Sequence, residues 1–465
     1  MVFPEGERPA ALHIENGLIE RIVEYASDDP TGARIFDTGD LVVSPGLVDT
    51  HVHINEPGRA AWEGFDTATR AAAAGGVTTL VDMPLNSIPA TTNVAALHAK
   101  WEAARAQCHV DVGFWGGVVP GNAGELDALV DAGVRGFKCF LVPSGVDEFA
   151  PVDEDDLRQA LPVLARRHMP LLVHAELPEY LVAPTDPTNQ THATHPTQYA
   201  TYLATRPPQA ELEAVRLVIR LAEEFRTHVH IVHVSSAEGV AAIAAAKAAS
   251  VAVTAETCPH YLTFAAGEIA DGATEFKCAP PIRASAHRDA LWHALDSGVL
   301  DLIATDHSPS PPELKRPGGV GDFVAAWGGI ASLELSLAAV WTRLRAFGAS
   351  AGQARGRAVG ASARQAESGG SAARSDLARW MSAAPASLAG LGTRKGQIAP
   401  GFDADLVVWD PDNQVVVTPS RLHQRHKLTP YAGLSLAGSV ATTFVRGERV
   451  WDANRLTRAY GGRLL

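Results

Sequence analysis

The sequence predicts an α/β protein in which a (β/α)₈ barrel carries a small β-sandwich formed by both ends of the chain. Between residues 47 and 306, eight apolar segments alternate with amphipathic helical patterns. At both ends, short strand patterns separated by turn residues follow one another without helices. Parallel strands joined by right-handed helical crossovers are buried on both faces, which explains the apolar runs. A doubly wound open sheet has the same periodicity and remains the structural alternative.

Each element is expected from its local pattern. The N-terminal sandwich strands are expected at 11–14, 18–23 and 41–43, and C-terminal ones at 398, 405–409, 414–417 and 442–445. The expected barrel strands are 47–53, 78–83, 110–117, 136–140, 171–175, 229–234, 251–257 and 302–306. Amphipathic periodicity predicts helices at 62–74, 94–106, 154–167, 210–226, 237–249 and 288–295. The predicted domains are 1–44 and 395–465 for the two parts of the sandwich and 45–394 for the barrel.

Residues 348–374 interrupt this pattern with a run of Ala, Gly, Ser and Arg that contains no aromatic residue. Such a composition buries too little apolar surface to offset the entropy of ordering, so a mobile surface insertion is predicted. We interpret its arginines as solvated charges rather than a docking site for an acidic partner; they are Arg355, Arg357, Arg364 and Arg374.

Composition narrows the class of protein. The chain has 465 residues, and 39 Lys plus Arg against 52 Asp plus Glu give a net charge of -13, which argues against nucleic acid and anionic membranes as partners. Four cysteines form no CxxC pair and lie in or beside apolar runs, as expected for reduced thiols; they are Cys108, Cys139, Cys258 and Cys278. No signal-peptide pattern or membrane-spanning apolar run is present, so a cytoplasmic protein is expected.

Ligand-type side chains occur at the ends of five expected barrel strands. His51 and His53 are two apart on one strand and therefore share a face, as two metal ligands require. The carboxyl ends of barrel strands converge at one mouth, so groups distant in sequence meet there. The remaining candidates are Lys138, His174, His233 and Asp306. Each histidine has an alternative role as a hydrogen-bonded core residue, and Asp306 has one as a helix cap.

Lys138 lies between Phe137 and Phe140 in an apolar strand, where an unpaired ammonium costs several kcal/mol. A neutral buried amine can take up carbon dioxide and become a carbamate, an anion with two oxygens that can bridge two metal ions. A salt bridge from Lys138 to a barrel carboxylate is the alternative.

Together these six residues resemble the binuclear metal signature of the amidohydrolase superfamily, in its cyclic amidase branch. Further motifs across nearly the whole chain resemble the allantoinase family; they are NEPGRAAWEG at 55–64, DMPLN at 82–86, ETCPHY at 256–261, APPIR at 279–283, DHSPSPPE at 306–313, WGGI at 327–330 and RHKLTPY at 425–431. The family usually starts with one more strand, so this chain is expected to be a few residues short at its N-terminus, and its 348–374 segment is longer than usual.

The resemblance implies hydrolysis of the cyclic amide of allantoin at two divalent metal ions, with zinc expected and cobalt, manganese or nickel also suited to N/O ligands. It implies that His51, His53 and Asp306 hold one ion and His174 and His233 the other, with carboxylated Lys138 as a bridge and Asp306 as the proton carrier. It also implies a homotetramer.

Three other functions stay open. Dihydroorotases typically have an arginine two residues after His-x-His, where this chain has Asn55, and hydantoinases usually have a tyrosine shortly after the lysine, which residues 141–148 lack. A non-catalytic scaffold related to these enzymes is the third, and it is disfavoured because all six groups are present. Asn86 and the backbone around Ala279 are the candidate contacts for a neutral ureido group.

Overall fold

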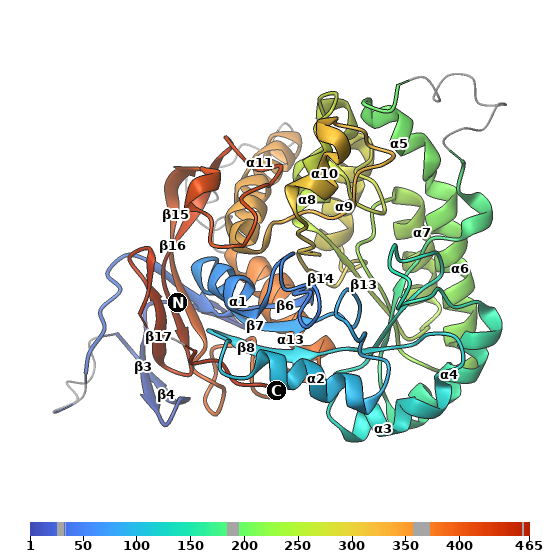
Figure 1. Cartoon of the computed structure of the whole chain (residues 1–465). Helices are drawn as coiled ribbons and strands as arrows, with labels where there is room; N and C mark the ends of the chain where they lie inside the picture. The colour runs from blue at the N-terminus through green and yellow to red at the C-terminus, as the bar shows by residue number, and fades with distance from the viewer. Residues whose placement is uncertain (26–31, 33, 184–194, 357–372, 458–459) are drawn as a thin grey trace.

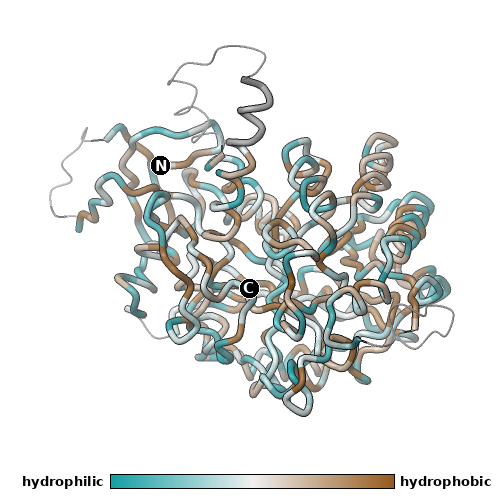
Figure 2. Tube along the Cα trace, turned by 90° about the horizontal axis from the view of Figure 1, so that it is seen from above, coloured by the Kyte–Doolittle hydropathy of each residue, from teal (hydrophilic) through white to brown (hydrophobic). Residues whose placement is uncertain are grey.

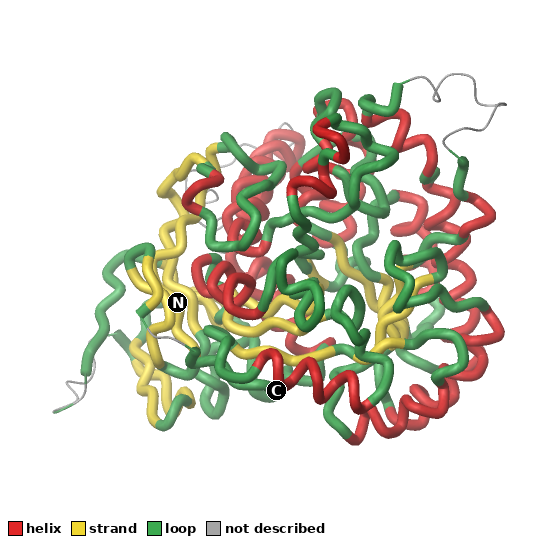
Figure 3. Tube along the Cα trace, in the orientation of Figure 1, coloured by secondary structure: helices red, strands yellow, loops and turns green. Residues whose placement is uncertain are grey.

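The computed structural model describes residues 1–25, 32, 34–183, 195–356, 373–457 and 460–465, with the backbone alone at 349–356. Its centre is a closed parallel barrel surrounded by helices (Figure 1, Figure 3). The barrel strands are β6 (Leu47–Val52), β7 (Val77–Asp82), β8 (Asp111–Phe114), β9 (Gly116–Gly117), β10 (Phe137–Phe140), β11 (Leu171–His174), β12 (Val229–Ile231), β13 (Val253–Thr257) and β14 (Leu302–Ile303). The closed barrel excludes the open doubly wound sheet.

The third barrel strand is made of two pieces. β8 pairs in parallel with β7, and β9 pairs in parallel with β10, so Trp115 marks the point where the strand changes neighbours. The Trp115 indole lies inside the barrel and donates to the carbonyl oxygen of Thr50 at 2.8 Å. The barrel closes beyond β14, where the backbone N–H of His53 donates to the carbonyl oxygen of His307 at 2.8 Å. Eight strand positions therefore form one ring.

The helices cover the outside of this ring because one face of each is apolar. In α6 (Pro208–Phe225) the buried residues recur three or four positions apart, and in Figure 2 the outer helices alternate between hydrophilic and hydrophobic residues. The other helices are α1 (Phe65–Ala74), α2 (Val94–Ala104), α3 (Leu126–Asp131), α4 (Glu154–Arg167), α5 (Tyr199–Thr205), α7 (Ala237–Ala248), α8 (Pro259–Thr263), α9 (Ser285–Asp296), α10 (Pro312–Lys315), α11 (Ser336–Gly356) and α13 (Ala384–Leu388).

All eight predicted barrel strands and all six predicted helices are present, with ends shifted by up to three residues in most of them. The helices that the sequence patterns missed are mainly short, such as α5 and α8, where fewer than three turns give no clear period. The long α11 was missed as well, because its second half falls in the Ala, Gly, Ser and Arg run.

Both ends of the chain build the β-domain beside the barrel, as predicted (Figure 1). β5 (Val42–Pro45) from the N-terminal part pairs antiparallel with β15 (Leu406–Val416), and β15 continues to β16 (Ser435–Val445), β17 (Glu448–Asp452) and β18 (Arg455–Leu456). The hairpin of β3 (Ala11–Glu15) and β4 (Leu18–Val23) contacts the C-terminal part through a bridge between Leu18 and Asp403. A ribbon of β1 (Val2–Phe3) and β2 (Gly6–Glu7) completes the N-terminal strands.

The segment predicted to be a mobile insertion, 348–374, is helical at both of its ends, where the structure describes it. Helix α11 runs to Gly356, and residues 373–378 are helical again. Arg374, interpreted as a solvated charge, forms a two-pronged ion pair with Glu7 of β2 at 2.7 and 2.8 Å. A bidentate guanidinium–carboxylate pair offsets the entropy of ordering the chain there. The middle of the predicted insertion, 357–372, lies outside the described residues.

A buried charge cluster joins the barrel to the β-domain. The ammonium of Lys395 is fully buried and lies 2.8 Å from Asp111 of β8, 3.0 Å from Asp403 and 2.6 Å from Asp405. Arg446 also pairs with Asp111. Burial by itself lowers the pKa of Lys395, but the carboxylates outweigh it and raise the pKa. The lysine therefore stays charged and holds three carboxylates from two parts of the chain.

The segment 461–465 lies along the edge of β8 that the switch at Trp115 leaves open. The backbone N–H of Val112 donates to Arg463 and that of Leu465 to Val112, both at 2.9 Å. Gly462 passes so close that a Cβ atom there would stand 1.9 Å from the carbonyl oxygen of Val110. Among the described residues, no helix is both long and apolar enough to span a bilayer.

We expect Lys395→Met to lower the free energy of unfolding by about 3–5 kcal/mol, because removing one partner leaves buried carboxylates without their cation. The matched control is Lys247→Met, whose ammonium pairs with Asp301 at 2.7 Å on a partly exposed surface. That variant should lose less than about 1 kcal/mol. Urea unfolding followed by circular dichroism measures both, and equal losses would contradict the role given to the cluster.

Candidate active site

Six predicted ligand residues meet at the carboxyl end of the barrel. The strand ends turn them inward, and all six side chains are buried. They lie in β6, β10 and β11 or in the residues that follow β6, β12 and β14; they are His51, His53, Lys138, His174, His233 and Asp306. The barrel fold thus brings together every ligand-type group that the sequence singled out.

Asp306 is the link between the first and last strands of the ring. Its Oδ1 lies 3.2 Å from Nε2 of His51 and 3.4 Å from Nε2 of His53. His51, His233 and Asp306 each offer one ligand atom, and these atoms all lie within 4.8 Å of one another. The ring of His174 meets that of His233 edge to face, with 4.6 Å between centroids. The carboxylate of Asp306 therefore lies among the imidazoles, and its alternative interpretation as a helix cap is excluded.

The backbone is held in an unusual conformation at four positions around this centre. Asn55, Asn86, His233 and Asp306 all have positive φ, between 41° and 67°. A non-glycine residue in this region costs about 1–3 kcal/mol and persists only where its surroundings impose it. His233 lies two residues beyond the end of β12 and Asp306 three residues beyond the end of β14, so the turn after each strand directs the ligand into the centre.

Lys138 and His233 carry buried polar atoms without partners. Among the described residues, neither Lys138 Nζ nor His233 Nδ1 has a hydrogen-bond partner, so no described carboxylate forms the alternative salt bridge with Lys138. Lys138 Nζ lies 4.8 Å from the centroid of the Phe140 ring. Burial lowers the pKa of Lys138 to about 8, so a neutral amine is accessible near physiological pH.

Burial also sets the charges of the other groups. It lowers the pKa values of His53 and His174 and holds that of His233 well below its usual value, so these imidazoles are neutral at pH 7. For Asp306, burial raises the pKa, but His51 and His53 outweigh it and hold the pKa well below its usual value. Neutral imidazoles and an ionised carboxylate are the protonation states that bind divalent metals.

Two buried carboxylates that sequence reasoning did not assign orient the histidines. Glu256 of β13 accepts from Nδ1 of His51 at 2.5 Å and from His230 at 3.0 Å. Glu176 lies 2.8 Å from Nε2 of His174. Such partners fix the tautomer and the ring orientation of a ligating histidine. The sequence feature that could have pointed to them is their position: Glu256 lies within the apolar segment 251–257, and Glu176 comes just after the segment 171–175.

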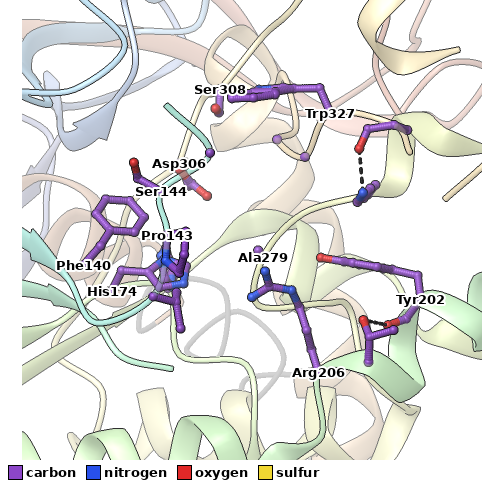
Figure 4. A pocket seen from close by; sticks show the side chains of 18 of the residues that line it. Phe140, Pro143, Ser144, His174, Tyr202, Arg206, Ala279, Asp306, Ser308 and Trp327 are labelled. Atoms are coloured by element: carbon purple, nitrogen blue, oxygen red, sulfur yellow. Dashed lines mark hydrogen bonds between the residues drawn. The ribbon is translucent and has the colours of Figure 1, made fainter. Parts of the chain in front are cut away.

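The four histidines and Asp306 line a cavity of about 440 Å³, whereas Lys138 is not among its lining residues. Figure 4 shows Asp306 and His174 on one side and Tyr202, Arg206 and Ala279 across from them. Both predicted substrate contacts, Asn86 and Ala279, line the cavity, and whether they touch a substrate stays a prediction.

Asn55 is not among the described residues that line the cavity. Its side chain is buried and donates to the carbonyl oxygen of Pro309 at 3.4 Å. The cations on the wall are instead Arg206 and Lys277, which sequence reasoning did not identify. The charge of the pocket wall is therefore set by Arg206 and Lys277 rather than by the residue at position 55.

The donor set fits divalent metal ions. Four imidazoles and one carboxylate are N/O ligands of the kind that zinc and neighbouring metals accept. The unpartnered Lys138 Nζ and His233 Nδ1 are the atoms that a bound ion or a modified lysine would satisfy. Since unpartnered buried polar atoms cost free energy, their presence beside the four other ligand groups points to a metal centre.

Comparison with known proteins agrees with this geometry. A model of the amidohydrolase family matches residues 42–450. Allantoinase from Streptomyces avermitilis is 47% identical over 461 residues, covering 99% of this chain and 96% of that protein. Allantoinase from Saccharomyces cerevisiae is 43% identical, covering 91% of this chain and 86% of that protein.

The fold also matches solved structures. The L-hydantoinase (dihydropyrimidinase) from Arthrobacter aurescens superposes with a TM-score of 0.87 at 30% identity, covering 100% of this chain and 97% of that one. The dihydropyrimidinase from Brevibacillus agri gives a TM-score of 0.84 at 27% identity, covering 100% and 96%. The chain belongs to the amidohydrolase family and, within it, groups by sequence with the allantoinases.

Proposed function

We propose that this enzyme hydrolyses the ring amide of allantoin and releases allantoate. The observation that carries the proposal is the convergence of four histidines and Asp306 on one cavity, with the buried Lys138 on the neighbouring strand β10, in a chain that is 47% identical to an allantoinase. We propose that His51, His53 and Asp306 hold one divalent metal ion and His174 and His233 the other, with N6-carboxylated Lys138 shared between them. Zinc is the first candidate for both.

The reaction adds one water across a C–N bond. Metal ions at this centre would supply a water that is deprotonated at neutral pH and would polarise the ring carbonyl. Asp306, ionised because of its histidine neighbours, accepts the proton of the attacking water. As the ring C–N bond breaks, Asp306 returns that proton to the leaving nitrogen, which is a poor leaving group without it. The products are one carboxylate and one free N–H in the opened chain.

The carboxylates behind the histidines maintain this geometry. Glu256 holds the ring of His51 through Nδ1, which leaves Nε2 facing Asp306. Glu176 holds Nε2 of His174, which leaves Nδ1 for the centre. The rings of His51 and His174 are therefore each fixed by one nitrogen and offer the other.

Hydantoinase or dihydropyrimidinase activity is the second candidate, and the similarity of the backbone to those enzymes supports it. Residues 141–148 supply no tyrosine to the cavity. The hydroxyl of Ser144 donates to the carbonyl oxygens of Val146 and Phe149, and that of Tyr202 donates to Cys278 at 2.7 Å. Both hydroxyls are thus occupied by the chain, and the hydroxyl donor expected of hydantoinases is not offered from these positions.

A homotetramer, a cytoplasmic location and a role in purine catabolism belong to the same proposal. They rest on the family resemblance and on the composition of the chain.

We expect protein purified without chelator to hold close to two transition-metal equivalents per chain, because the six groups form two ligand sets. His51→Ala and His233→Ala should lose metal and activity together. Elemental analysis and turnover assays of the same samples measure this. A fully active sample with one equivalent would exclude the shared lysine, and retained activity in either variant would indicate an ordinary core histidine.

Lys138→Ala should lose most of the activity, because the side chain that joins the two ligand sets is gone. A small carboxylic acid with excess metal should restore part of it by occupying the vacated space. Intact-mass measurement on the metal-loaded wild type tests the modification directly. An unmodified amine in the fully active enzyme would refute the carbamate.

The kcat/KM for allantoin should exceed that for dihydroorotate or dihydrouracil at least roughly a hundredfold, about 2.7 kcal/mol of discrimination in the transition state. The charge of Arg206 is already balanced by Glu176, and the ammonium of Lys277 donates to two backbone carbonyl oxygens. Both cations among the described wall residues therefore have partners, and neither is free to pair with the carboxylate of dihydroorotate. A hydrolysis panel of allantoin, hydantoin, dihydrouracil and dihydroorotate measures this. Better turnover of hydantoin or dihydrouracil would transfer the assignment to a hydantoinase.

A further inference from the structure

The wall of the cavity opposite the ligand groups carries two cations whose roles differ. Lys277 donates to the carbonyl oxygens of Val324 and Ala326 and so fastens the segment that includes Trp327. Arg206 follows the last residue of α5 and reaches into the cavity between His174 and Tyr202 (Figure 4). Lys277 is therefore committed to the wall itself, whereas Arg206 faces the space that a substrate occupies.

Arg206 is tied to the ligand centre by a single carboxylate. Oε2 of the fully buried Glu176 accepts from Arg206 and also lies 2.8 Å from Nε2 of His174. The carboxylate of Glu176 thus links the guanidinium of Arg206 to His174, one of the ligand groups. Burial lowers the pKa of Arg206, but Glu176 outweighs it and raises the pKa, so the group is charged at every relevant pH.

The backbone around Arg206 is braced at several points. Its carbonyl oxygen accepts from the guanidinium of Arg283 at 3.0 Å, and its N–H donates to Leu203 at 3.2 Å. The neighbouring carbonyl oxygen of Thr205 accepts from Val182 at 2.9 Å. A side chain that starts from a fixed backbone and is held at its tip by Glu176 needs little ordering when a ligand arrives, which favours a binding role.

The guanidinium of Arg206 has more N–H donors than described hydrogen-bond partners. A guanidinium has five N–H donors, and among the described residues its one hydrogen-bond partner is Glu176. Because Glu176 already balances the charge, a second carboxylate at this place would be repelled by the first. A neutral carbonyl oxygen is not repelled and still gains a charge-assisted hydrogen bond.

We propose that Arg206 is the specificity residue that binds the carbonyl oxygen of the ureido arm of the substrate. The inference rests on the proposed function. In allantoin the carbon next to the reacting carbonyl carries this arm, so a substrate whose carbonyl lies at the ligand centre extends the arm into the adjoining cavity. Hydantoin has the same ring and no arm, which makes the two compounds a matched pair.

The test uses Arg206→Lys in the full chain. Lysine keeps a positive charge beside Glu176, so Glu176 can still hold the ring of His174. Lysine lacks the planar guanidinium, whose several N–H groups can donate to two acceptors at once. The control is Arg216→Lys on the outer surface of α6, where the guanidinium pairs with Glu213 at 2.6 Å. Metal content and thermal unfolding of both variants confirm that the centre and the fold are intact.

For Arg206→Lys we expect kcat/KM for allantoin to fall about 10- to 100-fold, the range of one charge-assisted hydrogen bond. Hydantoin is used as a competitor of allantoin, so its inhibition constant can be measured even if hydantoin itself is not turned over. This constant should stay within about threefold of the wild-type value. Arg216→Lys should change neither value.

Equal weakening of allantoin and hydantoin in Arg206→Lys would show that Arg206 acts only by positioning Glu176 and His174, and it would overturn the inference. Unchanged kcat/KM for allantoin would overturn it too. In both cases the proposed function stands, because the wild type opens allantoin. A wild type that turns over hydantoin but not allantoin would instead refute the proposed function together with this inference.

Discussion

The contact between the first and last barrel strands is the one on which the site depends. The backbone N–H of His53 bonds to His307, and the side chain of Asp49 accepts from the N–H of Thr305 at 3.2 Å. These bonds close the ring, and they place Asp306 beside the two histidines of β6. An open sheet would leave these residues at opposite edges. Closure of the barrel therefore creates the pairing of carboxylate and imidazoles that the chemistry requires.

The interior of this barrel is organised around polar groups as well as apolar packing. At the carboxyl end, Lys138 and His233 each keep a polar atom without a partner among the residues that the structure describes, which is costly unless another group satisfies it. Toward the β-domain, Lys395 is as deeply buried but has three carboxylates around it. The two lysines show opposite solutions to the burial of an amine. Lys395 stays charged because three carboxylates surround it, whereas burial lowers the pKa of Lys138 and leaves its amine available for chemistry.

Similar backbones support different ring specificities in this family. The hydantoinase and dihydropyrimidinase structures superpose on the whole chain at 27–30% identity, so neither the barrel nor the β-domain distinguishes the substrates. Side chains on the cavity wall can change between related enzymes without changing the barrel strands that carry them. In this chain the balanced pair of Arg206 and Glu176 favours a neutral carbonyl over a carboxylate, and it connects the wall to His174.

The sequence by itself determined the barrel, its eight strands and the six ligand-type residues, because apolar periodicity and strand-end residues are local features. His51 and His53 reveal their shared face through spacing alone, and Lys138 stands out because its neighbours are apolar. Local pattern could not decide which distant residues touch. Glu256 behind His51, Glu176 between His174 and Arg206, and Arg374 against Glu7 are contacts across 205, 30 and 367 positions of the chain. The tertiary structure alone decided that Asn55 turns away from the cavity and Arg206 turns into it, because side-chain direction at a loop depends on the backbone that packs around it.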